Sequence, residues 1–266
     1  MAEEPKPRTA AANGRLWGAR SRDWSEIQEG LVRPAYEAVL GRLRVGAGTA
    51  YLDAGCGAGM AAQMAAARGA RVSGIDAADG MLAVAKSRVP AGDFRAGDLE
   101  ELPFADRSFD VVTGFNSFQY AANPVIALKE ARRVTRPAGG IAIVTWGTPE
   151  GMEAVSVITA LRTVMPPPPP GAPGPFALSE EAALRRFAAD AGLKPGEILD
   201  IDAPFVYRDL ATALRGLGSS GVAARAIEHA GEKAVHDAHE TAIAPFRQPD
   251  GSYRIGARFR CLFATP

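Results

Sequence analysis

The stretch YLDAGCGAG, residues 51–59, restricts the fold of this chain more than any other part of its sequence. A short apolar run there ends in Asp53. Three glycines follow at every second position: Gly55, Gly57 and Gly59. Glycine loses more conformational freedom on folding than any other residue, so three of them at the end of a buried strand need a reason. A tight turn from a strand into a helix, with its backbone open to a ligand, supplies that reason.

Around this turn, the patterns of strands and helices alternate along the chain. Apolar runs typical of strands occur at 50–54, 70–76, 93–98, 109–115 and 140–146. Segments with helical spacing lie between them, at 60–68, 80–88 and 124–134. Strands and helices that alternate at these lengths form parallel βαβ units, so we predict an α/β fold with an open sheet covered on both faces.

The flanking segments complete a single domain, 1–266. Its predicted parts, in chain order, are a flexible start at 1–13, cap helices at 14–44, a cofactor-binding core at 45–150, a proline-rich connection at 166–175, a helical lid insertion at 209–245 and a final strand at 253–264. Consecutive prolines cannot join the interior of a sheet, so the connection is predicted to be an extended surface segment. The sheet is expected to gain two late strands, with the lid between them.

Composition and charge exclude several classes of protein. Lysine and arginine together number 30, as do aspartate and glutamate, so no net charge attracts nucleic acid or an anionic membrane. Cys56 and Cys261 match no metal-ligand spacing, and no metal is expected. The start of the chain lacks the apolar core of a secretory signal, and no stretch approaches the roughly 18 apolar residues that span a bilayer. We therefore predict a cytoplasmic protein without a nucleic-acid or membrane partner.

Acidic residues at the ends of two strands indicate a nucleoside site beside the glycine turn. Asp76 ends the second strand about 20 residues after Asp53, the usual position of a carboxylate that accepts both ribose hydroxyls. Asp98 follows the third strand and is expected beside the same cleft. The glycines read GxGxG, and Met60 stands where the dinucleotide fingerprint has its last glycine. The pattern therefore favours a nucleoside other than a nicotinamide dinucleotide.

These motifs, together with FDVVTGFNSFQY at 109–120 and RVTRPAGGIAIVTWG at 133–147, resemble the class I S-adenosylmethionine-dependent methyltransferases. The likeness covers about 45–150 and is to the small-molecule, type 11-like branch. It implies a Rossmann-like, doubly wound, seven-stranded, mostly parallel sheet with helices on both faces, N-terminal helices and a helical insertion before the last strand. Ala138 departs from the family's more frequent RPGG, in a turn remote from the cleft.

Carried over by motif position, the resemblance implies a set of contacts with S-adenosylmethionine. The methionine end would lie at Asp53, Gly55 and Gly57 and at the backbone of Phe115 and Asn116, the ribose at Asp76, and the adenine at Met81, Asp98 and the backbone of Leu99, with Cys56, Ala77 and Gly97 as neighbours. Each residue also has a plain structural interpretation. Aspartates cap helices and turns, Met81 is a typical core residue, and a cysteine within a glycine turn is a small filler rather than a nucleophile.

The methyl acceptor is predicted to bind beside the N-terminal helices, the loop after the fourth strand and the lid. Candidate acceptor-binding residues are Trp17, Trp24, Gln119 and Tyr120, and for the aromatic ones ordinary packing is the alternative. Residues 116–119 read NSFQ, whereas nucleobase amino-methyltransferases carry an (Asp/Asn)-Pro-Pro-aromatic sequence there. We therefore expect a small, partly apolar acceptor that is methylated at oxygen, nitrogen or carbon.

A general base is needed only if the acceptor must lose a proton, because the sulfonium methyl is already electrophilic. The three histidines of the chain, His229, His236 and His239, all lie in the lid. If 226–243 is one helix, its apolar stripe contains Ile227, Ala230, Ala234 and Ala238. His229 and His236 point away from this stripe, and His239 lies at its flank. We rank His239 first, His236 second and Tyr120 third as candidate bases, with a solvated helix face as the alternative for the histidines.

Three other functions remain open at this stage. A nicotinamide-dependent oxidoreductase is opposed by the GxGxG turn and by Asp98. A non-catalytic module that binds the nucleoside or a protein partner would keep the same glycines and carboxylates. Methylation of a protein or an RNA is disfavoured by the neutral charge. The chain is expected to be a monomer or a homodimer.

Overall fold

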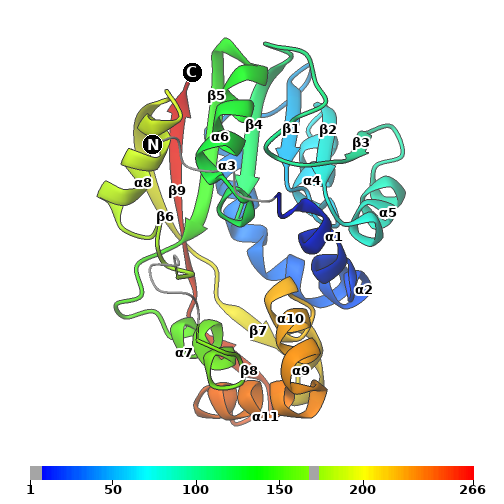
Figure 1. Cartoon of the computed structure of the whole chain (residues 1–266), viewed down its shortest axis with the longest axis vertical. Helices are drawn as coiled ribbons and strands as arrows, with labels where there is room; N and C mark the ends of the chain where they lie inside the picture. The colour runs from blue at the N-terminus through cyan, green and yellow to red at the C-terminus, as the bar shows by residue number, and fades with distance from the viewer. Residues whose placement is uncertain (1–7, 168–173) are drawn as a thin grey trace.

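A seven-stranded sheet organises the described part of the chain, which comprises residues 8–167 and 174–266 of the computed structural model (Figure 1). The strands are β1 (Ala50–Ala54), β2 (Arg71–Asp76), β3 (Asp93–Ala96), β4 (Phe109–Phe115), β5 (Thr135–Trp146), β6 (Lys194–Asp202) and β9 (Arg258–Thr265). Most of the proline-rich connection, 168–173, and the first seven residues lie outside the described residues.

The sheet order is β3-β2-β1-β4-β5-β9-β6. The strands from β3 to β5 pair in parallel, whereas β9 runs antiparallel to both β5 and β6. The chain winds outward from β1 to β3 and then returns to place β4 beside β1. The winding direction therefore reverses between β1 and β4, which is where α/β sheets bind their ligands. The predicted fold class, with a mostly parallel sheet and two late strands, is confirmed.

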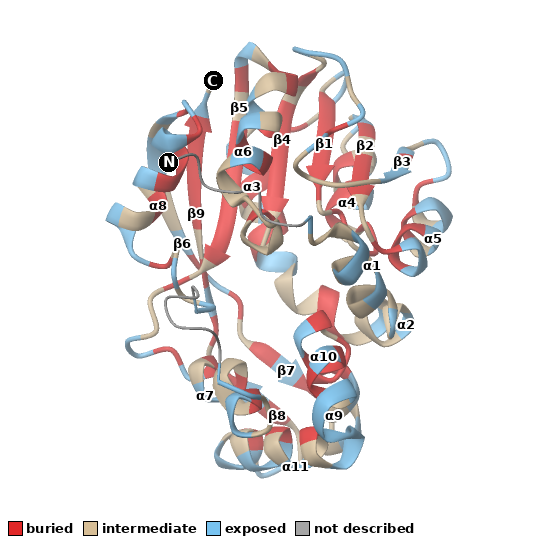
Figure 2. Ribbon diagram, in the orientation of Figure 1, coloured by how far each residue is buried: buried red, intermediate tan, exposed pale blue. Residues whose placement is uncertain are grey.

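Helices cover both faces of this sheet. One face packs against α6 (Pro124–Val134) and α8 (Glu181–Asp190), through Leu128 and Leu184 among others. The other packs against α3 (Arg33–Arg42), α4 (Met60–Ala67) and α5 (Asp79–Arg88). The central strands β1, β4, β5 and β9 are buried along most of their length, whereas the edge strands β3 and β6 and the outer helix surfaces are largely exposed or half-buried (Figure 2). Pro34 and Pro124 lie in the first turns of their helices, where a missing N–H costs nothing.

A smaller layer lies beyond the carboxyl ends of the strands, in the lower half of Figure 1. It contains α7 (Ala154–Thr159), η4 (Ala160–Thr163), α9 (Leu210–Leu217), α10 (Gly221–Ala230), α11 (Glu232–Ile243), η5 (Ala244–Phe246) and a separate pair of strands, β7 (Phe205–Tyr207) and β8 (Tyr253–Ile255). Its core includes Met152, Phe205, Tyr207, Leu217 and Ile243. The helical insertion between β6 and β9 is thus present, and we call α9 to α11 the lid.

The N-terminal cap, residues 9–32, is α1 (Ala10–Gly18), α2 (Ser21–Asp23), the π-helix η1 (Trp24–Gln28), the 3₁₀-helix η2 (Glu29–Val32) and their links. The predicted flexible start is wrong from Thr9 onward, because Thr9 Oγ1 and Asn13 Nδ2 donate hydrogen bonds to the carbonyl of Tyr120.

The predicted final strand, 253–264, is two strands in the structure, since the chain leaves β8 at Ile255 and enters the main sheet at Arg258. None of the described helices is long and apolar enough to cross a membrane.

Candidate functional site

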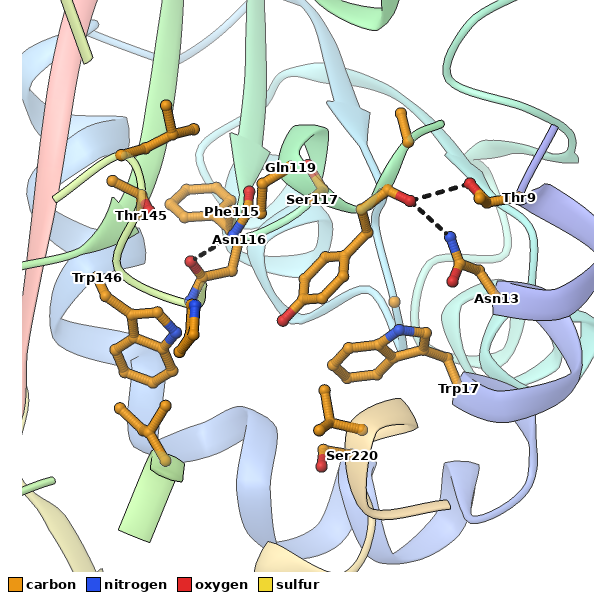
Figure 3. A pocket seen from close by; sticks show the side chains of 18 of the residues that line it. Thr9, Asn13, Trp17, Phe115, Asn116, Ser117, Gln119, Thr145, Trp146 and Ser220 are labelled. Atoms are coloured by element: carbon orange, nitrogen blue, oxygen red, sulfur yellow. Dashed lines mark hydrogen bonds between the residues drawn. The ribbon is translucent and has the colours of Figure 1, made fainter. Parts of the chain in front are cut away.

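A cavity of about 1260 Å³ lies at the carboxyl ends of β1, β2 and β4, between the sheet, the N-terminal cap and the lid. Its wall contains residues from the glycine turn, from the loop after β4, from α1 and from α10 (Figure 3). Figure 3 shows Trp17 and Trp146 on opposite sides of the open space, with Phe115 and Asn116 above it and Ser220 below. We name the two halves of the cavity after the ligands predicted for them from the sequence: the cofactor half lies beside the glycine turn, and the acceptor half lies beside the lid.

The glycines of the turn serve different purposes. Gly55 has φ +79°, and a β-carbon there would lie 2.3 Å from the Ser117 Cβ, so Gly55 is required for packing. Gly57 has φ +52°, and the nearest protein atom to its β-carbon position is Trp24 Nε1, at 3.7 Å. Gly57 lines the cavity, so its open side is available to a ligand that lies against the backbone.

Asp76 fixes the shape of this turn. Its Oδ2 accepts a hydrogen bond from the Gly57 amide at 2.8 Å, and its Oδ1 accepts one from the Ala78 amide at 2.9 Å. Burial raises the pKa of this carboxyl, although the backbone donors act in the opposite direction. Each carboxylate oxygen can accept a further hydrogen bond, and Asp76 lines the cavity. The carboxylate therefore has acceptor capacity left for a diol.

Asp98 carries a polar atom that the surrounding protein leaves without a hydrogen bond. Its Oδ1 accepts from the Glu100 amide at 2.9 Å, whereas Oδ2 is buried and has no hydrogen-bond partner among the described residues. The Nε of Arg8 lies 3.9 Å away, beyond hydrogen-bond distance. Buried polar atoms are rarely left unsatisfied, so a ligand that donates an N–H at this part of the cavity wall would fit.

The remaining predicted cofactor residues separate into two groups. Six of them line the cavity: Ala77, Met81, Gly97, Leu99, Phe115 and Asn116. Asp53 and Cys56 do not, so direct side-chain contacts from these two are not supported. Asp53 instead accepts a hydrogen bond from Thr113 Oγ1 at 3.0 Å, and burial raises its pKa to about 7. Cys56 is buried beneath the turn beside Gly74, and burial raises the pKa of its thiol.

The predicted acceptor residues all line the cavity: Trp17, Trp24, Gln119 and Tyr120. The Trp17 ring packs edge-to-face against Trp24 at 5.2 Å and against Tyr120 at 5.5 Å. Gln119 Nε2 donates to Asn116 Oδ1 at 2.9 Å, a bond drawn in Figure 3. Burial raises the pKa of Tyr120 to about 12, so its phenol is protonated at neutral pH and can donate a hydrogen bond.

The histidines do not lie on one helix. Gly231, at φ +84°, separates α10 from α11, so the single-helix projection of 226–243 is wrong. The buried stripe of α11 is Val235, His239 and Ile243, and Ala230 is exposed. His239 lines the cavity with 3% of its surface exposed, whereas His236 does not line it and lies 3.7 Å from Glu232. Of the three histidines, only His239 therefore lies in the cavity wall.

The electrostatic state of His239 follows from its burial. Desolvation, assisted by the neighbouring His236, lowers the pKa of His239 to about 4. Its Nδ1 has no hydrogen-bond partner in the described ranges. The imidazole is thus neutral at physiological pH and keeps an unsatisfied nitrogen.

Several functional positions were missed from the sequence. Thr145 and Trp146, at the end of β5, line the cavity, and the same strand-end rule that located Asp76 could have identified them. Glu29 is 2% exposed, accepts from the Met60 amide at 3.0 Å and pairs with Arg88. It fixes the N-terminal cap to the start of α4. No sequence signal marks it, because its partners lie far away along the chain.

Comparisons with known proteins agree with this geometry. Residues 52–143 match the family model described as a methyltransferase domain. The chain is 38% identical over 136 residues to a malonyl-[acyl-carrier protein] O-methyltransferase of Erwinia pyrifoliae, covering 51% of this chain and 50% of that protein. It is 34% identical over 149 residues to a demethylmenaquinone methyltransferase of Paenarthrobacter aurescens, covering 56% and 54%.

The chain thus matches about half the length of these curated relatives. Its fold also resembles that of an S-adenosylmethionine-dependent methyltransferase from Aquifex aeolicus, with a TM-score of 0.53 at 19% identity, covering 68% of this chain and 92% of that one. At that identity the likeness concerns the fold alone. Residues 52–143 are thus similar to a methyltransferase domain, and the glycine turn and the two strand-end aspartates, Asp76 and Asp98, all lie within this stretch.

Proposed function

We propose that this protein transfers a methyl group from S-adenosylmethionine to an oxygen, nitrogen or carbon nucleophile of a small, partly apolar molecule. The observation that carries the proposal is the continuity of one cavity, in which Gly57, Asp76 and Asp98 share a wall with Trp17 and Trp146. A nucleoside with a reactive centre and an apolar second molecule can therefore meet inside it. The names of the two relatives specify different acceptors, so they select neither for this chain.

The residues of the cofactor half fit S-adenosylmethionine. Asp76 would accept the ribose hydroxyls, the unsatisfied Oδ2 of Asp98 would accept the adenine amino group, and the buried thioether of Met81 would pack on the adenine face. The open side of Gly57 leaves room for the methionine portion along the backbone. When bound, this cofactor supplies an electrophilic methyl group.

The contribution of the protein to the chemistry is mainly position and the exclusion of water. The N-terminal cap and the lid close over the cavity, and Trp17 lies against Gly221 of α10, where a β-carbon would come within 2.6 Å of the indole. Tyr120 can donate a hydrogen bond to the acceptor. If the acceptor is a phenol or an acidic carbon, neutral His239 is the group placed to accept its proton.

Calorimetry with S-adenosylmethionine and with reduced nicotinamide dinucleotide tests the cofactor assignment. We expect the first to bind and the second not to, and the reverse result would favour the oxidoreductase. Release of S-adenosylhomocysteine during a screen of small aromatic and aliphatic acceptors then tests catalysis. Binding of the nucleoside without turnover of any acceptor in a broad screen would favour a non-catalytic nucleoside-binding module.

The role of His239 requires the acceptor found in that screen. Loss of a true base lowers the rate about 10²- to 10⁴-fold, so single-turnover transfer by His239→Ala should fall by this factor while nucleoside affinity is kept. His229→Ala, an exposed change in the same lid, is the matched control. A full rate in His239→Ala between pH 6 and 9 would mean that transfer proceeds by positioning alone.

A further inference from the structure

The charged residues of the cavity wall are divided between its two halves. The carboxylates among the lining residues are Asp76 and Asp98, both in the cofactor half. The cations are Arg162 on η4 and Arg225 on α10, both in the acceptor half. The acceptor half therefore carries positive charge without a lining carboxylate among the described residues, although the chain as a whole has no net charge.

Packing places the two arginines on one side of the cavity. Leu161, the neighbour of Arg162, packs in one cluster with Ala223 and Ala226, which flank Arg225 on α10. Both arginines are exposed residues, which locates them at the opening of the cavity rather than in its depth. The lid also begins here, because Ser220 lines the cavity and caps α10 by accepting from the Ala223 amide at 3.1 Å. The positive end of the α10 helix dipole thus lies on the same side.

Other arginines of the lid and the N-terminal cap have acidic partners. Arg15 pairs with Glu228, Arg20 with Glu232, and Arg215 with Asp23. In contrast, neither Arg162 nor Arg225 has a carboxylate within 4.0 Å in the ranges 8–167 and 174–266. Guanidinium groups bind carboxylates and phosphates through two parallel hydrogen bonds, so a pair of arginines without a protein counter-ion suits an anionic ligand.

Most of the side chains that line the acceptor half are apolar. Side chains that line it include Trp146, Val157, Leu161, Met165, Phe205 and Phe259. His239 lies among these side chains and exposes only 3% of its surface. Its Nδ1 has no hydrogen-bond partner among the described residues. A polar nitrogen in an apolar wall indicates that the ligand itself carries a polar group at this depth.

We propose that the methyl acceptor is an amphipathic anion, whose apolar body fills the acceptor half and whose carboxylate or phosphate binds Arg162 and Arg225. This inference rests on the proposed function and specifies the class of its acceptor. The nucleophile lies at the end of the molecule that reaches the glycine turn, and the anionic group lies at the end that reaches the opening. His239 contacts the acceptor between them.

Binding of simple amphiphiles to the protein saturated with S-adenosylhomocysteine tests this inference. The probes are dodecanoate, dodecyl phosphate, 1-dodecanol and dodecyltrimethylammonium, measured by calorimetry below their micelle concentrations. We expect one or both anions to bind at least about 10-fold more tightly than the alcohol, the gain of a charge-assisted hydrogen bond, and the cation to bind most weakly. The stronger of the two anions identifies the headgroup as carboxylate or phosphate.

Substitution of each arginine tests whether the anionic group binds there. Arg162→Gln and Arg225→Gln should each weaken binding of the preferred anion about 3- to 10-fold, a range reduced for solvent screening, and leave the alcohol unaffected. Arg254→Gln is the matched control, because Arg254 is an exposed arginine on β8 that does not line the cavity. Equal affinity for anion and alcohol, or an equal loss in Arg254→Gln, would overturn the inference.

A titration with S-adenosylhomocysteine alone distinguishes a wrong acceptor class from a wrong proposed function. If it binds and the anions show no preference, the acceptor class is wrong and the methyltransferase proposal stands. If it does not bind, the proposed function fails, and the acceptor class with it.

Discussion

The two halves of the cavity are built in different ways. In the cofactor half, hydrogen bonds to the backbone hold the polar groups in place. Asp76 accepts hydrogen bonds from the amides of Gly57 and Ala78, and the Asn116 amide donates one to the Val144 carbonyl. In the acceptor half, the wall is assembled from η4, β7, the lid and the N-terminal cap, which are far apart in sequence. Ion pairs between exposed side chains, such as Arg15 with Glu228, join the last two.

This difference has a physical consequence. Backbone hydrogen bonds at the end of a buried strand do not move without loss of the fold, whereas exposed ion pairs contribute only about 0–1 kcal/mol each. The cofactor half should therefore be rigid, and the acceptor half should open and close. Such a division allows a common cofactor site to serve different acceptors. The following experiments test this difference between the two halves.

The largest effect is expected at Gly57. Gly57→Val would place side-chain atoms on the open side of the turn, and we expect nucleoside binding to be lost while the protein stays folded. Gly48→Val is a matched control, since Gly48 has φ +80°, faces open space and lies outside the cavity lining. Calorimetry and circular dichroism of both variants are the measurements, and normal nucleoside binding by Gly57→Val would place the cofactor elsewhere.

The acid stability of the protein tests the buried imidazole of the acceptor half. The pKa of His239 falls from an ordinary 6.5 to about 4, so between these values the unfolded chain binds the proton and the folded one does not. This site is therefore expected to reduce the free energy of unfolding as pH falls from 6.5 to 4, by about 3 kcal/mol in total. Urea unfolding of the wild type and His239→Leu across this range measures the difference, with His229→Leu as control. A difference between the two proteins that does not change with pH would show that His239 is solvated.

Asp53, beside the cofactor half, should act in the opposite direction. Burial raises its pKa from 3.8 to about 7, so the folded state binds the proton in this range and loses stability as pH rises through it. Comparison of Asp53→Asn with the wild type isolates this contribution. We expect the free energy of unfolding of the variant, relative to the wild type, to increase between pH 4 and pH 7, and a flat difference would place a compensating donor beside Asp53.

A smaller effect is expected at the ribose carboxylate. Asp76→Asn keeps one oxygen acceptor for the backbone but removes the charge that strengthens hydrogen bonds to the ribose. The expected loss of binding free energy is about 1.5–3 kcal/mol. Asp79→Asn, at the exposed start of α5 and outside the main cavity, should bind as the wild type does. Equal affinities of Asp76→Asn and the wild type in calorimetry would remove Asp76 from the ribose site.

The smallest effect concerns the junction of the lid and the N-terminal cap. Arg215→Gln removes a pair with Asp23 and should change the free energy of unfolding little, because solvent screens the pair, yet raise amide hydrogen exchange in α9 to α11. Lys233→Gln is the control, because Lys233 pairs with Asp237 within the lid itself. Ligand in both halves should slow exchange in the wild type. Uniform protection equal to that of β1 and β4 in every sample would mean that the lid is a fixed part of the fold.

Local patterns in the sequence were enough to predict most of the residues that line the cofactor half of the cavity. Its residues follow one another along a few strands and turns, so the rule that ligands bind at strand ends identified Gly57, Asp76 and Asp98 without a structure. Those patterns do not reveal which side of a turn is buried. The sequence could not distinguish Asp53, which points to Thr113, from Asp76, which lines the cavity.

The acceptor half was beyond such prediction because contacts between distant segments create it. Trp17 and Tyr120 were candidates by residue type alone, and only the packing of α1 against the loop after β4 and against α10 brings them together. The break at Gly231 places His239 within the buried stripe of α11, whereas the assumed continuous helix had put it at the flank of the apolar stripe. The sequence by itself thus determined the sheet, the glycine turn and the strand-end aspartates that line the cavity beside it, since these depend on local periodicity and strand ends. The tertiary structure decided which aromatic, histidine and arginine side chains share the second half of the cavity, since burial and charge pairing depend on neighbours far away in the chain.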